Sequence, residues 1–145
     1  MHPYPHLYTA AASGRPEGAV ALTSPRLPEI ASWPPPEFDG PGDAWSPETL
    51  LCAALADCFV LSFRAIARAS KLEWSALACR VEGVLERVDG VAQFTRYTTY
   101  ANLKVPASAD ADKARKMLEK AEHVCLISNS LRGQRTLVAE VETTD

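Results

Sequence analysis

Two cysteines occupy segments where a thiol could do redox chemistry. Cys58 falls in the apolar run of residues 50–63, and Cys125 directly follows a later helical pattern. A thiolate is the nucleophile toward peroxides, whereas a buried thiol is a small core hydrophobe, so both interpretations are open at this point. Within the predicted helix, Asp57 precedes Cys58 and Arg64 lies on another face. No local cation therefore favours a thiolate, and an activating charge must come from elsewhere in the fold.

The other cysteines form no recognisable metal site. The chain has four cysteines, with no CxxC pair and no zinc-like spacing. His123 and Cys125 form an isolated HxC, which is weak evidence for a ligand pair, so we expect no metal. His123 could orient Cys125, but an exposed histidine at a helix end is the simpler interpretation. Cys52 and Cys79 are expected to be core residues.

The composition suits one soluble globular domain over residues 1–145, with 47% hydrophobic and 23% charged residues. A formal net charge of −3 disfavours a nucleic-acid partner, and the lack of a basic amphipathic helix disfavours a membrane surface. The N-terminal residues lack a signal-peptide pattern, and the longest apolar run, interrupted by Asp57, is too short to span a bilayer. We therefore expect a cytoplasmic protein whose thiols are normally reduced.

A long helix is predicted from Ser46 to about Ser70. Ser46 can cap it, Pro47 suits the first helical position, and Glu48 suits the positive end of the helix dipole. Its first half is apolar on nearly every face, which indicates a buried central helix. Because one small sheet cannot cover such a helix, we expect a second copy of the chain to supply the missing surface.

Strand patterns flank this helix in the sequence. Residues 75–88 and 91–105 alternate like half-buried strands around Asp89-Gly90, a strong hairpin signal. Further patterns predict strands at 7–12, 19–23, near 27–30 and at 136–142, with a proline-rich loop over 24–45. A second helix is predicted over 108–123, capped by Ser108 or Asp110, with one apolar face formed by Ala114, Met117, Leu118 and Ala121. This order predicts an α+β fold with antiparallel strand pairing.

Three segments of the sequence form a specific combination. Ser46-Pro47-Glu48 is followed by small residues and by Cys58, ten positions after the glutamate. The segment Cys125-Leu126-Ile127-Ser128-Asn129 has the pattern C-x-x-S-N, and Gly14-Arg15 is a G-R pair in the early hairpin. In these three segments the chain resembles the OsmC/Ohr superfamily of osmotically inducible and organic hydroperoxide resistance proteins, and the first segment is similar to the central-helix signature of that family.

The resemblance implies an OsmC-like fold, with antiparallel sheets wrapped around a long central helix in an intertwined homodimer. It implies a thiol-dependent peroxidase for organic hydroperoxides, in which Cys58 is peroxidatic and Cys125 is resolving. Arg15 and Glu48 would be the pair that supports the thiolate, with Arg26 as the alternative arginine. No bound cofactor is implied, and the reductant would be an external dithiol such as dihydrolipoamide or a lipoylated protein.

The spacing of Glu48 and Cys58 limits their contact. Ten residues of α-helix rise about 15 Å, so Glu48 cannot touch Cys58 of its own helix. If both serve one site, either Glu48 and Arg15 come from a partner chain or Arg15 bridges the gap. Leu126 stands where the family often has proline, and Pro16-Glu17 departs from the Ohr pattern after Arg15. These departures indicate an OsmC-like relative rather than a typical Ohr enzyme.

Other hypotheses remain beside the peroxidase. Aromatic residues could line an apolar pocket for an alkyl hydroperoxide, or those in the loop could simply pack on it: Trp33, Phe38, Trp45 and Phe59. A second hypothesis is a non-catalytic OsmC-like dimer that binds a small hydrophobic ligand or senses redox state. A third is a hotdog-like thioesterase, for which Asp57 is the one acidic candidate within the apolar run.

Overall fold

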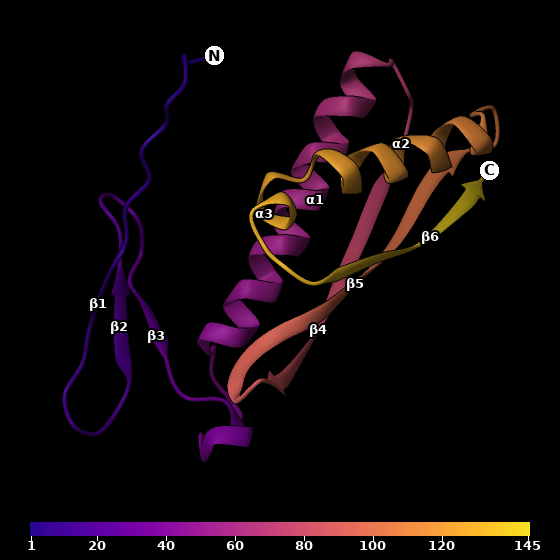
Figure 1. The fold of residues 1–145 in the computed structure, drawn as a ribbon. Coiled ribbons are helices and arrows are strands. Elements are labelled where there is room, and N and C mark those ends of the chain that lie inside the picture. The colour runs from indigo at the N-terminus through magenta and orange to yellow at the C-terminus, as the bar shows by residue number, and fades with distance from the viewer. The chain divides into compact units, whose positions relative to one another are not determined.

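The computed structural model describes residues 1–145 in two compact units, Met1–Leu51 and Cys52–Asp145 (Figure 1). The first unit contains three strands, a short 3-10 helix and the first turn of a long helix: β1 (Ala11–Ser13), β2 (Val20–Thr23), β3 (Ile30–Ser32), η1 (Pro36–Phe38) and α1 (Pro47–Ala69). The second contains the rest of α1 and five further elements: β4 (Ala76–Val88), β5 (Val91–Pro106), α2 (Ala111–Val124), α3 (Leu126–Asn129) and β6 (Gln134–Thr144). Sheets and one long helix confirm the predicted α+β class, while a single domain over residues 1–145 stays a prediction.

The first unit holds a three-stranded antiparallel sheet in the order β1-β2-β3. Its first strand begins at Ala11 rather than at residue 7. The third strand begins at Ile30 rather than near residue 27, because the Leu27 N–H closes a turn onto the Ser24 carbonyl at 3.1 Å. The predicted loop over residues 24–45 therefore contains both a strand and the short helix η1.

Helix α1 begins as its sequence predicts. The Ser46 hydroxyl accepts from the Thr49 N–H at 3.2 Å, and the Ser46 N–H donates back to the Thr49 hydroxyl at 2.9 Å. These reciprocal bonds satisfy groups that the helix leaves free at its start, and Pro47 has no N–H to satisfy. The predicted start and end are confirmed to within a residue, because the helix runs from Pro47 to Ala69.

One face of α1 is buried within the chain. Its buried side chains, Leu55, Phe59, Phe63 and Ala67, recur every four residues and form a single stripe. Leu61 is 49% exposed. The expectation of a helix covered on every side is therefore not met by one chain. The helix is long and apolar enough to cross a membrane by length and composition alone, a test that the core helix of a soluble protein also passes.

Strands β4 and β5 form the predicted hairpin. Asp89 and Gly90 both have positive φ, 51° and 79°, which is the geometry of the tight turn that suits the strand twist. A bulge between Val84 and Leu85 shifts the register. The predicted alternation breaks at this bulge: Val84 is half-buried, Leu85 is 40% exposed, and residues 85–88 are all exposed.

The final strand corrects the predicted pairing. β6 pairs with β5 in parallel register, with Tyr97 opposite Arg135 and Leu103 opposite Val141. Antiparallel pairing of every strand was therefore wrong. The physical reason is the connection, because α2 and α3 separate β5 from β6 and a helical crossover returns the chain to the same end of the sheet. Figure 1 shows α2 lying along β6.

Helix α2 closes the core of the second unit. The Asp110 carboxylate accepts from the Asp112 and Lys113 N–H groups at 3.0 and 3.1 Å, which confirms one of the two predicted caps. The predicted apolar face is the buried one, formed by Ala114, Met117, Leu118 and Ala121. These residues join the buried stripe of α1 and the inner face of β5 in one hydrophobic cluster.

Candidate functional site

The Cys58 and Cys125 thiols meet in the second unit. Cys58 lies on α1 and is half-buried, whereas Cys125 is fully buried between α2 and α3. Both are free thiols, and the Cys58 thiol is near enough to raise the pKa of the Cys125 thiol. The Ser62 hydroxyl lies 4.0 Å from the Cys58 sulfur, one helical turn away. Two reduced thiols from segments far apart in the sequence thus lie near each other, as the formation of a disulfide requires.

The corner between α2 and α3 places Cys125. The backbone of Cys125 is non-helical, with φ −59° and ψ 108°, so α2 ends at Val124 and α3 begins at Leu126. Leu126 is 63% exposed. As the first residue of α3, its N–H needs no acceptor within the helix, which is also why proline suits such a position. A leucine here therefore preserves the turn that proline would shape.

Ser128 is the nearest polar neighbour of Cys125. Burial raises the pKa of the Cys125 thiol, while the nearby hydroxyl and main-chain N–H of Ser128 lower that pKa. The balance leaves the pKa above its ordinary value, with burial as the larger effect. The C-x-x-S-N motif contains Ser128, but the motif alone does not indicate that Ser128 acts on the Cys125 thiol. Its position three residues after Cys125, across one turn of α3, is the signal that could have found it.

Arg135 holds the two sides of this corner together. It donates to the Glu122 carboxylate at 2.9 Å and to the Asn129 side-chain oxygen at 2.7 Å, and also to the Glu122 carbonyl. The Asn129 amide donates to the His123 carbonyl at 3.2 Å. The His123 side chain is exposed, so its contribution here comes through the main chain. No pattern in the sequence pointed to Arg135, because it lies on β6.

Cys79 and Cys52 are half-buried, as expected of core residues. Burial raises the pKa of the Cys79 thiol to about 12, and the nearby Glu122 carboxylate and Cys125 add to this rise. Burial also raises the pKa of the Cys52 thiol, although the Gly83 main chain lowers it through a hydrogen bond. Both thiols are therefore held in the protonated form, which is a poor nucleophile.

The predicted supporting residues Arg15 and Glu48 lie in the first unit. Arg15 is exposed between β1 and β2. The Glu48 carboxylate has a buried oxygen with no hydrogen-bond partner. The ion pairs of the chain are Arg80–Glu82 and Arg135–Glu122, so a single chain does not pair Arg15 with Glu48. Arg26 is exposed, in the turn before β3.

An apolar cavity of about 450 Å³ lies in the first unit. Glu48 contributes to its wall, together with Trp33 and Phe38 from the predicted aromatic set. Further apolar side chains complete the lining, among them Val20, Leu22 and Leu50. Trp45 is 50% exposed and lies outside the cavity, and Phe59 is 1% exposed in the core of the second unit. The structure thus brings together two of the four predicted pocket residues, with a carboxylate beside them.

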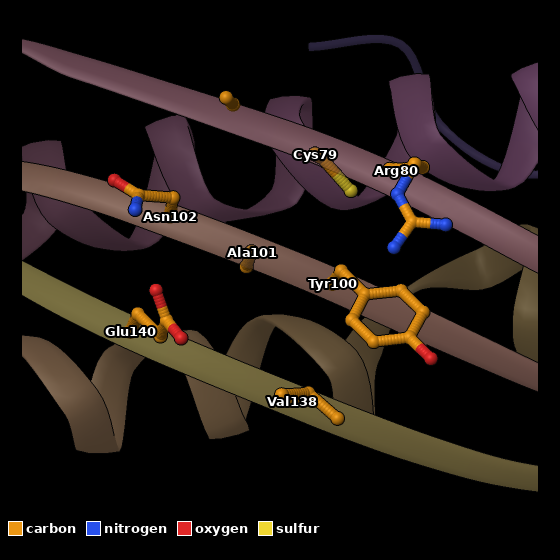
Figure 2. Close-up of a pocket in the computed structure, with 8 residues that line it drawn as sticks. Cys79, Arg80, Tyr100, Ala101, Asn102, Val138 and Glu140 are labelled. Carbon is orange, nitrogen blue, oxygen red and sulfur yellow. The ribbon is translucent and has the colours of Figure 1, made fainter.

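A second depression, of about 290 Å³, opens on the sheet of the second unit (Figure 2). Its side chains come from neighbouring strands, and the Arg80 guanidinium lies over the Tyr100 ring at 4.2 Å. Cys79 and Ala101 alternate with these residues and form part of its floor. No group of three or more metal-ligating side chains occurs in the chain. The thiol pair is therefore the arrangement with distinctive chemistry.

Comparison with known proteins places the chain in a family. The family model for OsmC-like proteins matches residues 40–140. A curated relative, the uncharacterized protein YmaD of Bacillus subtilis, is 30% identical over 109 residues, which is 73% of each chain. An OsmC-like protein of unknown function from Vibrio cholerae has the same fold, with a TM-score of 0.85 at 16% identity, covering 93% of this chain and 99% of that one. A Legionella pneumophila protein described as an organic hydroperoxide resistance protein matches with a TM-score of 0.75 at 26% identity, covering 97% and 99%. The chain belongs to the OsmC-like protein family.

Proposed function

We propose that the protein is a thiol-dependent peroxidase that reduces organic hydroperoxides to alcohols. The proximity of the reduced Cys58 and Cys125 thiols carries this proposal. Cys58 is the more exposed of the two and is therefore assigned the attack on the peroxide, while the fully buried Cys125 is assigned the resolving role. The name of the Legionella relative, an organic hydroperoxide resistance protein, supports the substrate class.

The proposed catalytic cycle has three steps. The Cys58 thiolate attacks the distal oxygen of the hydroperoxide, the O–O bond breaks, and the leaving alkoxide takes a proton to become an alcohol. Cys125 then attacks the resulting sulfenic acid, so that a disulfide forms and water leaves. An external dithiol finally reduces the disulfide by exchange and is itself oxidised to a disulfide. A dihydrolipoamide-type dithiol, free or carried on a lipoylated protein, is the proposed reductant.

A homodimer supplies what one chain lacks. The exposed face of α1, with Leu61 at 49% exposure, needs an apolar cover. The buried Glu48 oxygen without a partner needs a donor, which a guanidinium can provide. We propose that Arg15 and Glu48 support the Cys58 thiolate of the opposite subunit. We also propose that the protein acts in the cytoplasm, where its thiols are kept reduced.

The cavity in the first unit favours a second candidate function, the binding of a small hydrophobic ligand without turnover. Its volume of about 450 Å³ and its lining by Trp33 and Phe38 suit such a ligand. The two functions differ in their covalent outcome. A peroxidase accumulates a disulfide when it is given peroxide without reductant, whereas a binding protein keeps its thiols.

Turnover with a dithiol tests the peroxidase directly. Purified protein, dihydrolipoamide and tert-butyl or cumene hydroperoxide should show peroxide consumption that a Cys58→Ser variant loses. Cys52→Ser is the matched control, because it makes the same change on the same helix and should retain activity. Full activity in Cys58→Ser would exclude the mechanism.

A further inference from the structure

The backbone around Cys125 is poorly held by its own helices. α3 has only four residues, and a helix of that length is not stable by itself. Cys125 itself lies outside both α2 and α3. A resolving thiol on such a corner needs contacts from elsewhere in the fold if its sulfur is to stay in place.

Arg135 supplies these contacts from both sides of Cys125. On the side before Cys125, it reaches the carboxylate and the carbonyl of Glu122. On the side after Cys125, it reaches the side-chain oxygen of Asn129 at 2.7 Å. Asn129 in turn donates to the His123 carbonyl, which ties the end of α3 back to the end of α2. One guanidinium therefore spans the whole corner.

The arrangement is specific to arginine. The Arg135 and Glu122 side chains are 28% and 15% exposed, so the pair is largely shielded from water. Three different nitrogens of the guanidinium donate to three acceptors, a pattern that a lysine ammonium cannot reproduce. The charge also lies against the carboxyl end of α2, where a cation is favourable.

The position of Arg135 is fixed by the sheet. Arg135 is the second residue of β6 and is paired with Tyr97 of β5. The turn before it contains Gly133, whose φ is +112° and where a Cβ would lie 2.9 Å from the Thr95 carbonyl oxygen. Only glycine suits that close approach. The guanidinium is thus fixed to the sheet rather than to the corner it holds.

We propose that Arg135 is a positioning residue for resolution, which fixes the Cys125 sulfur for attack on oxidised Cys58. This inference rests on the proposed peroxidase function. Attack on the peroxide involves Cys58 and not the corner, so the first step does not depend on Arg135. Disulfide formation requires the two sulfurs to reach about 2.05 Å in a narrow geometry, so the second step does.

Separate measurement of the two steps tests this role. The full chain is mixed with one equivalent of tert-butyl hydroperoxide. The Cys58 sulfenic acid is trapped with a 1,3-diketone reagent, and the disulfide is measured by mass spectrometry. In Arg135→Gln we expect sulfenic acid at the wild-type rate, disulfide formation slower by about 10-fold or more, and more over-oxidised Cys58. Arg135→Lys should recover only part of the loss, and Asn129→Ala should slow the same step less.

Arg115→Gln is the matched control, because Arg115 donates to the Ala139 carbonyl of β6 at 2.7 Å without contacting the corner. It should leave both steps unchanged. Wild-type disulfide formation in both Arg135→Gln and Asn129→Ala would overturn the positioning role. Equal slowing of both steps together with a lower melting temperature would overturn it as well, in favour of a general structural role. Absence of any peroxide-dependent disulfide in the wild-type protein would instead reject the proposed function.

Discussion

Replacement of Ser128 by alanine should change the pH dependence of disulfide formation. Ser128 is 7% exposed and Cys125 is 0% exposed, and the hydroxyl and the N–H of Ser128 both lower the pKa of the Cys125 thiol. The substitution removes the hydroxyl and leaves the N–H. A hydrogen bond to a charged group contributes roughly 1.5–3 kcal/mol. Because the Ser128 N–H remains, the lower end of this range applies. About 1.5 kcal/mol corresponds to a roughly tenfold smaller thiolate fraction of Cys125 at pH values below the pKa of its thiol.

The lost donor also makes each remaining thiolate more reactive. Thiolate nucleophilicity rises with the thiol pKa, with a Brønsted slope of about 0.4–0.5, so a tenfold loss of population is offset by roughly threefold in reactivity. The variant should therefore form the disulfide roughly threefold more slowly than the wild type near neutral pH. Above the thiol pKa of both proteins it should be roughly threefold faster. The predicted signature is a crossover of the two pH profiles.

Rapid acid quenching after one equivalent of hydroperoxide, followed by alkylation and mass spectrometry, measures the disulfide step at each pH. Ser130→Ala is the matched control, because its hydroxyl donates to the Leu126 carbonyl at 2.8 Å and not to Cys125. A rate ratio for Ser128→Ala that is constant with pH would show that Ser128 does not tune the Cys125 thiol, as would a crossover in the control variant.

Three further predictions concern stability. The pKa of Cys79 is about 12 in the fold against 9.0 for an ordinary thiol, so this thiol stabilises the fold below pH 9 and loses that contribution as pH rises toward 12. In urea titrations at several pH values, Cys79→Ala should therefore show a smaller fall in the free energy of unfolding above about pH 9 than the wild type. An unchanged pH dependence would contradict this. Gly83→Ala should lower the free energy of unfolding by about 1–3 kcal/mol in the same assay, because a Cβ there meets Phe94 at 3.0 Å and Cys52 at 3.1 Å. An unchanged free energy of unfolding would show that both side chains move freely. Leu126→Pro should leave the melting temperature unchanged or raise it, because the preceding residue, Cys125, already has the extended ψ that a proline requires before it. A clear loss of stability would contradict the assignment of Leu126 to the first position of α3.

Local signals explain why most elements were predictable. Ser46-Pro47 marks the start of α1, and Asp89-Gly90 marks the turn between β4 and β5, because each feature depends only on neighbouring residues. The buried face of α2 was likewise predictable from the spacing of its apolar residues. The pairing of Cys58 with Cys125 was implied by the family resemblance rather than by their spacing.

Non-local packing explains what the sequence did not reveal. The bulge at Val84 and Leu85 depends on how β4 meets β5, and nothing in either strand alone marks it. The parallel pairing of β6 depends on the path of α2 across the sheet. Arg135 reaches the Cys125 corner through the tertiary fold, so no motif contains both residues. The buried face of α1 depends on the elements that pack against it, which a helix sequence apolar on nearly every face does not reveal.

If Cys58 and Cys125 are one redox pair, an organic hydroperoxide should link them to each other and to no other cysteine. Peptide mapping of the full chain after one equivalent of the hydroperoxide, without reductant, measures this linkage. We expect one Cys58–Cys125 disulfide per chain, with Cys52 and Cys79 still reduced, and complete reversal by dihydrolipoamide. Recovery of Cys58 and Cys125 as unlinked thiols, or a disulfide that joins other cysteines, would contradict it.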